Sequence, residues 1–165
     1  MTSNFITFET DIGWMGIAGT PAGINKIILP MQDRESIIKT IANAEYSEES
    51  YLLETKNALI KYFKGKQVNF QIPLDLSGYT EFQKSVWNVA KNIPYGELRS
   101  YKWVATQIGN TKAVRAVGNA LGKNPIPIII PCHRVIGSDG KLHGFTGGLD
   151  WKKKLIELET KHHVR

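Results

Sequence analysis

The chain is poor in cysteine and has no long apolar run. It has one cysteine among its 165 residues and therefore cannot form an internal disulfide. No apolar run approaches the roughly 18 residues that span a bilayer, and no signal-peptide pattern stands at its start. These features argue against a disulfide-stapled secreted fold and against a membrane protein. We therefore expect a cytoplasmic protein in a reducing compartment.

Ligands for a structural metal are also scarce. A structural zinc site usually takes four Cys or His side chains. Here the only cysteine, Cys132, lies beside one of just four histidines, and the pair His162 and His163 near the end of the chain could bind a metal only weakly. We expect no metal site.

Acidic residues are fewer than basic ones. The chain has 15 Asp and Glu against 21 Lys and Arg, which gives a formal net charge of +6 and an isoelectric point near 9.4. Cationic surfaces attract polyanions, so this balance favours a phosphate-bearing partner, although many basic proteins bind no nucleic acid. The run Lys152 to Lys154 also fits the solvated face of a last helix whose apolar side is Leu155, Ile156 and Leu158.

The first half of the chain alternates strand and helix signals. Three short apolar runs separated by turn residues predict an antiparallel meander, two helical periods follow, and a period of two then returns. With 42% hydrophobic residues the chain can bury a core without staples. No catalytic cluster stands out, so we expect a small structural α+β layer. The segments are 5–8, 14–18, 24–29, 33–44, 47–63 and 68–72.

A boundary is predicted between Pro73 and Gly78, where prolines, an aspartate and a glycine interrupt both patterns. We divide the chain into an N-terminal structural domain, 1–76, and a catalytic domain, 77–165. The second domain opens with a capping box at 80–83, which predicts the start of a helix.

A helix-turn-helix pattern follows. Helical spacing over 101–108, a glycine turn at 109–111 and a second helix over 112–121 have the lengths of this motif. The pattern is moderately specific for DNA, because two short helices around a glycine also occur as plain packing units. The second helix is built of small residues, and beyond its first position Arg115 is its one long cation. Such a helix can approach a partner closely.

Cys132 stands in the sequence Ile-Pro-Cys-His-Arg-Val, after an apolar run at 126–130 that reads as a buried strand. A lone cysteine is often an inert core residue. A histidine and an arginine directly after it are costly to bury without partners, however, and this favours a site. Cationic neighbours lower a thiol pKa, so we expect His133 and Arg134 to bring the pKa of Cys132 toward neutrality and to make it a nucleophile.

The sequence Pro-Cys-His-Arg-Val resembles the active-site signature of the O6-alkylguanine-DNA alkyltransferases, also called methylated-DNA-protein-cysteine methyltransferases. A long collinear set of this kind is more specific than one short motif. The resemblance implies an α+β fold, with a ribonuclease H-like N-terminal domain and a winged helix-turn-helix domain. It runs from about Thr80 to Glu159, through Tyr-Gly-Glu at 95–97, Arg-Ala-Val-Gly-Asn at 115–119, Asn-Pro-Ile-Pro-Ile at 124–128 and Gly-Gly at 147–148.

The resemblance also implies a reaction. The protein would repair double-stranded DNA by direct reversal, moving the alkyl group of a flipped-out O6-alkylguanine to Cys132. The resemblance leaves open whether O4-alkylthymine is also a substrate. The thioether product is not cleaved by water under mild conditions, so each molecule would act once, with no cofactor. We expect a monomer that associates with the nucleoid when it is bound to DNA.

Residue roles follow from the same resemblance. His133 would take the thiol proton through a water, and Glu159 would orient the imidazole. Tyr101 would assist protonation of the departing guanine, and Asn124 would hold the active-site turn.

The DNA and substrate contacts are also carried over by resemblance. Arg115 would be pushed into the base stack from the minor groove. Phe145 stands where the family usually has a tyrosine, so a hydroxyl donor is absent from the pocket. The other predicted DNA contacts are Thr111, Lys112, Ala116, Gly118 and Arg134, and the predicted pocket residues are Tyr101, Leu121, Val135, Phe145, Thr146 and Gly147.

Two alternatives compete with this reading. A non-catalytic sensor of alkylated DNA would use the same fold, but such relatives replace the cysteine, which this chain keeps. A cysteine hydrolase would need a nucleophile and a base that face each other, which the adjacent residues Cys132 and His133 do not easily provide.

Overall fold

The computed structural model describes residues 3–41, 43–145 and 147–163. Its contacts divide the chain into two compact units, Met1–Ser77 and Gly78–Arg165. Both units combine helices with strands, so the predicted α+β class is confirmed. Within the described part of the chain, no helix is both long and apolar enough to cross a membrane.

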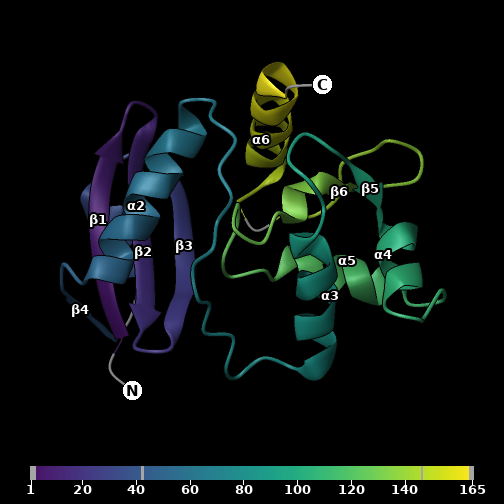
Figure 1. Cartoon of the computed structure of the whole chain (residues 1–165), viewed down its shortest axis with the longest axis horizontal. Coiled ribbons are helices and arrows are strands. Elements are labelled where there is room, and N and C mark those ends of the chain that lie inside the picture. Colours follow the sequence, from purple (N-terminus) through teal and green to yellow (C-terminus); the bar gives the residue numbers. More distant parts are fainter. Residues whose placement is uncertain (1–2, 42, 146, 164–165) are drawn as a thin grey trace. The chain divides into compact units, whose positions relative to one another are not determined.

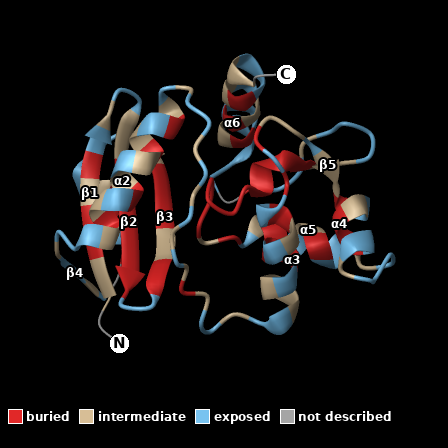
Figure 2. Cartoon of the chain, in the orientation of Figure 1, coloured by how far each residue is buried: buried red, intermediate tan, exposed pale blue. Residues whose placement is uncertain are grey.

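The first unit is built on a four-stranded sheet (Figure 1). Strands β1 (Ser3–Thr10), β2 (Gly13–Thr20) and β3 (Gly23–Met31) form the predicted antiparallel meander. A short strand that was not predicted, β4 (Ala44–Tyr46), pairs parallel with β1 and completes the order β3-β2-β1-β4. Buried residues run along β1, β2 and β3 (Figure 2).

Two helices cover this sheet, as the sequence predicts. They are α1 (Arg34–Thr40) and α2 (Ser50–Phe63). In β2, a Cβ added at Gly16 would strike Ile37 of α1, and one added at Gly19 would strike Tyr51 of α2. Positions three apart on a strand point to opposite faces. The helices therefore pack on opposite faces of the sheet.

The predicted strand at 68–72 is wrong. This segment is assigned to no strand, and the chain meets the sheet only afterwards, where Leu74 forms an isolated parallel bridge with Ile24 of β3. Ile24 donates to the Pro73 carbonyl at 2.9 Å and accepts from Asp75 at 2.8 Å. The alternating pattern reflects an extended chain whose residues are half-buried or exposed, and not a paired strand.

The second unit contains two short helices joined by a glycine turn. Helix α3 (Glu81–Lys91) begins with the predicted capping box at Thr80. Helices α4 (Tyr101–Gln107) and α5 (Val114–Gly122) follow, with Gly109 between them at φ +78°, a value that favours glycine. The indole of Trp87 in α3 donates to the carbonyl of Ala120 at 2.8 Å, which ties α5 to α3.

The remaining elements of the second unit include the short helix that carries the cysteine. Strand β5 (Arg99–Ser100) pairs parallel with β6 (Val135–Ile136), the short 3-10 helix η1 (Cys132–Arg134) precedes β6, and α6 (Leu149–His162) ends the described chain. The predicted strand at 126–130 is wrong, although its burial is confirmed. The segment is a tight loop with Ile128 at φ +75°, because flanking prolines cannot donate to a sheet ladder.

Candidate active site

Cys132 begins η1 and is only 2% exposed. The amide nitrogen of Asn124 donates to its Sγ at 3.0 Å and to the Ile130 carbonyl at 2.8 Å. The amide oxygen of Asn124 accepts from the Ile126 N–H at 2.9 Å. One buried side chain therefore holds both ends of the loop and touches the sulfur.

The thiol has a high pKa in this structure. Burial raises the pKa of Cys132 to about 11, and the Asn124 hydrogen bond and the charge of Lys152 oppose the shift without reversing it. The predicted lowering toward neutrality is therefore wrong for the free protein, because desolvation disfavours the thiolate more than the neighbours favour it. At neutral pH the thiol keeps its proton and needs a base.

His133 and Glu159 form a buried pair beside the cysteine. His133 is fully buried, and its Nε2 is bonded to a carboxylate oxygen of Glu159. Arg134 and the Gly96 N–H donate to the other oxygen of Glu159, at 2.8 and 3.1 Å. Burial alone would raise the pKa of Glu159, but the hydrogen bonds and charges of His133 and Arg134 hold it well below its usual range. Glu159 is therefore ionised.

The second nitrogen of His133 is positioned to act as a base. Burial lowers the pKa of His133, so the ring is neutral near pH 7. Ionised Glu159 can only accept a hydrogen bond, which assigns the ring proton to Nε2 and leaves the lone pair on Nδ1. In the described part of the chain Nδ1 has no hydrogen-bond partner. This nitrogen can accept a proton.

Arg134 does not fit the predicted DNA contact. It is 9% exposed, its Nε and Nη2 donate to Glu159, and its Nη1 donates to the Ile93 carbonyl at 2.7 Å. A guanidinium with these internal bonds is not available to a phosphate. Its position corrects the prediction, since the arginine supports Glu159 and with it the base.

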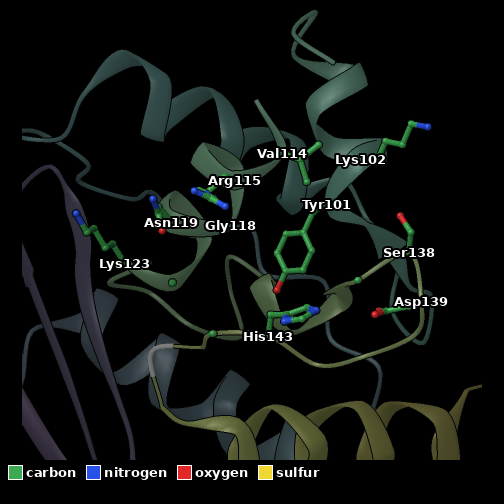
Figure 3. Close-up of a pocket in the computed structure, with 13 residues that line it drawn as sticks. Tyr101, Lys102, Val114, Arg115, Gly118, Asn119, Lys123, Ser138, Asp139 and His143 are labelled. Atoms are coloured by element: carbon green, nitrogen blue, oxygen red, sulfur yellow. The ribbon is translucent and has the colours of Figure 1, made fainter. Parts of the chain in front are cut away.

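A cleft of about 1060 Å³ opens next to α4 and α5 (Figure 3). Three predicted residues line it, namely Tyr101, Arg115 and Gly118. Figure 3 shows Tyr101 beside His143, and the centroids of their rings are 5.9 Å apart in an edge-on contact. The cations Lys102 and Lys123 also line the cleft, and no sequence motif singled them out.

The other predicted residues are not among those lining the cleft. Phe145 is buried and meets the His133 ring edge-on, with centroids 6.5 Å apart. Thr146 lies outside the described residues. Thr111, Lys112, Ala116 and Gly147 are exposed, and Leu121 and Val135 are buried.

Lys152 contradicts its assignment to a solvated face. It is fully buried, and its Nζ donates to the Tyr101 hydroxyl at 3.0 Å and to the His143 carbonyl at 2.9 Å. Its neighbours Lys153 and Lys154 are exposed as predicted. The helical spacing could have indicated this burial. Positions three and seven residues after Lys152 lie on its helix face, and the second of them is Glu159.

Comparisons with known proteins find relatives that match nearly the whole chain. The family model described as 6-O-methylguanine DNA methyltransferase, DNA binding domain, matches residues 81–161. The methylated-DNA-protein-cysteine methyltransferase of Methanosarcina acetivorans is 45% identical over 94% of this chain and 97% of its own length. The constitutive methyltransferase of that name from Bacillus subtilis is 42% identical over 94% of each chain.

Solved structures give the same result. A crystal structure of the Mycobacterium tuberculosis O6-methylguanine methyltransferase matches with a TM-score of 0.82 and 38% identity, over 99% of this chain and 96% of the other. A structure of the Mycobacterium tuberculosis protein in complex with DNA also has a TM-score of 0.82, at 39% identity, over 96% and 94% of the two chains.

Proposed function

Because this chain belongs to the methylated-DNA-protein-cysteine methyltransferase family, we propose that it repairs O6-alkylguanine in DNA by moving the alkyl group to Cys132 once per molecule. The observation that carries the proposal is the buried set of Cys132, His133 and Glu159, in a chain 45% identical to a named methyltransferase over nearly its whole length. The reaction is an alkyl transfer in which the protein is both catalyst and acceptor.

The first step is removal of the thiol proton. Nδ1 of His133 takes it through a bridging water, and the imidazolium that forms is stabilised by Glu159. Arg134 keeps Glu159 ionised, and the amide of Asn124 donates a hydrogen bond to the growing negative charge on sulfur. The high pKa of the resting thiol makes this base necessary.

The second step is displacement at the alkyl carbon. Sγ of Cys132 forms a bond to that carbon while the bond from carbon to O6 breaks, and guanine leaves with the electron pair. The hydroxyl of Tyr101 supplies a proton to the departing base. Burial raises the pKa of Tyr101 to about 12, so the hydroxyl carries its proton at neutral pH. The thioether does not hydrolyse, and the molecule is spent.

The DNA surface is formed by α5 and its surroundings. Exposed Arg115 and Ala116 lie on this helix, and Thr111 and Lys112 precede it. We propose that α5 enters the minor groove of double-stranded DNA and that Arg115 fills the gap left by the flipped nucleotide, whose extrusion costs roughly a few kcal/mol. Gly118, which lines the cleft, would let the DNA approach the helix closely.

The division of labour is part of the same proposal. Residues 77–165 act as a winged helix-turn-helix domain that carries the chemistry, and residues 1–76 act as a structural, ribonuclease H-like domain. The protein works as a monomer in the cytoplasm.

Intact-mass spectrometry tests the proposal. The protein is incubated with a duplex oligonucleotide that carries one O6-methylguanine, beside the variant Cys132→Ala. The expected result is a gain of one methyl group per protein, which the variant lacks. Binding of the duplex without a mass change would instead identify a non-catalytic sensor of alkylated DNA.

A further inference from the structure

Lys152 is a buried cation whose two recorded hydrogen bonds go to neutral oxygens. Its Nζ donates to the hydroxyl of Tyr101 and to the backbone carbonyl of His143, and the side chain is fully buried. Taking an ammonium out of water is costly unless an opposite charge compensates for it. A stable core has no need of this arrangement, which suggests a task in the site.

Groups from three segments lie around this ammonium. Tyr101 comes from α4, and Cys132 and His133 come from η1, while the loop before α6 contributes the backbone carbonyl of His143. On α6 itself Glu159 is already bonded to His133 and Arg134. Lys152 therefore lies close to the sulfur and the tyrosine without belonging to the buried His–Glu–Arg cluster.

The hydrogen bond to Lys152 fixes the direction of the tyrosine proton. A lysine ammonium has three donors and no acceptor, whereas a tyrosine hydroxyl has one hydrogen. The oxygen of Tyr101 must therefore accept from Nζ, and its own hydrogen must point away from Lys152. Tyr101 lines the cleft, so the cleft is where that hydrogen can find an acceptor.

We propose that Lys152 is a positioning residue that directs the hydroxyl proton of Tyr101 toward the departing guanine. Lys152 then supplies a replacement proton to the Tyr101 oxygen. This inference rests on the proposed function and adds a residue to its last step. The second bond of Lys152, to the His143 carbonyl, holds the ammonium in place and links the loop before α6 to α4.

The protons balance along this path. The bond from carbon to O6 breaks, the guanine anion takes the hydroxyl proton of Tyr101, and the resulting tyrosinate takes a proton from the Lys152 ammonium. Neutral Lys152 later recovers a proton from water, and the thiol proton has already left through His133. Burial lowers the pKa of Lys152 to about 8, still above neutral, so the ammonium is the main form before the reaction.

Single-turnover rates at saturating methylated duplex test the relay. Lys152→Met keeps the length of the side chain but has no acidic proton to donate. We expect this variant to slow methyl transfer about 100-fold, which is the scale of general acid catalysis. The exposed neighbour supplies the matched control, Lys153→Met, which should transfer at the wild-type rate. In a Tyr101→Phe background the Lys152 change should cost far less than in the wild type, since only the effect of its charge on Cys132 remains. Independent losses that multiply would overturn the relay.

Iodomethane separates this role from a structural one. It delivers the same methyl group to Cys132, but iodide leaves without needing a proton. Lys152→Met should therefore slow repair of DNA far more than methylation by iodomethane. Equal losses in the two reactions would show a general disturbance of the site and refute the inference.

The wild-type protein provides a test that needs no variant. The rate of methyl transfer from methylated duplex, plotted against pH, should fall above about pH 8, where Lys152 loses its proton. The substrate does not cause such a fall, because O6-methylguanine has no proton on N1. A profile without the fall, in a protein that does take up the methyl group, would contradict the relay while leaving the proposed function intact. Failure to take up methyl at all would refute the function itself.

Discussion

The two units of the molecule differ most in the charge that they bury. In the described residues of the first unit the buried charged side chain is Asp75, which accepts from the hydroxyls of Thr20 and Ser77, both at 2.6 Å. Among acidic, basic and imidazole side chains, the described second unit buries four, namely His133, Arg134, Lys152 and Glu159. Buried charge is expensive and contributes little to stability. Its concentration in one unit indicates where the chemistry lies, and the apolar sheet of the other unit indicates a scaffold.

The largest expected effect concerns the thiol in the charged unit. Because burial raises the pKa of Cys132 to about 11, the thiolate fraction should rise about tenfold per pH unit up to that value. Methylation of the free protein by iodomethane should therefore accelerate roughly a thousandfold between pH 7 and 10. Mass spectrometry follows the reaction, with Cys132→Ala as the blank. A rate that levels off near pH 8 would mean that the surrounding charges do lower the pKa of the thiol.

One pair of matched substitutions compares the two units directly. Glu159→Gln keeps the shape of the side chain but removes the charge that supports imidazolium formation on His133, so methyl transfer should fall about 100-fold. Asp75→Asn makes the same change in the first unit and should lower thermal stability while leaving the transfer rate unaltered. Single-turnover assays and thermal unfolding measure both variants. Comparable rate losses in the two would remove the division between scaffold and site.

A smaller effect is expected on the DNA surface. Arg115→Ala should slow repair of duplex DNA about tenfold, as expected for the loss of an inserted side chain worth about 1.4 kcal/mol. It should leave the reaction with free O6-benzylguanine unchanged, since no duplex needs to be held open. Arg34→Ala, at an exposed arginine of the first unit, is the matched control. Equal slowing on both substrates would remove the assignment of Arg115 to the opened base stack.

The smallest effect is expected at Phe145. The ring is buried against His133, so the Phe145→Tyr variant keeps the packing and adds one hydroxyl. We expect transfer from O6-methylguanine to rise by less than about threefold, within the worth of one hydrogen bond. Competition between methylated and benzylated duplexes would show whether the hydroxyl also changes the preference. A loss of activity would mean that the pocket has no room for the oxygen.

The sequence predicted most elements that carry local signals. The meander, the capping box at Thr80 and the glycine turn at 109–111 depend on neighbouring residues and were confirmed. The segments 68–72 and 126–130 have strand-like composition, but pairing depends on distant partners, and none is available to them in the described structure. The parallel pairing of β4 with β1 also joins residues distant in the sequence, so a local pattern could not predict it.

The site divides in a similar way. The structure brings Cys132, His133, Glu159 and Asn124 together, and the roles that the family resemblance implies for them stay predictions. Burial could not be judged from the sequence, and it explains the three corrections. Burial raises the pKa of the Cys132 thiol. Buried Arg134 bonds to Glu159 and not to DNA, and buried Lys152 bonds to the Tyr101 hydroxyl and not to solvent.

The central claim is that each protein molecule acts once, and a titration with substrate tests it most directly. Increasing amounts of duplex carrying a labelled O6-methylguanine are added to a fixed amount of protein, and the label bound to protein and the guanine restored in DNA are counted together. The account predicts that both stop at one per protein, with all of the label on the Cys132 peptide. Continued restoration of guanine beyond that point, or label on another residue, would contradict it.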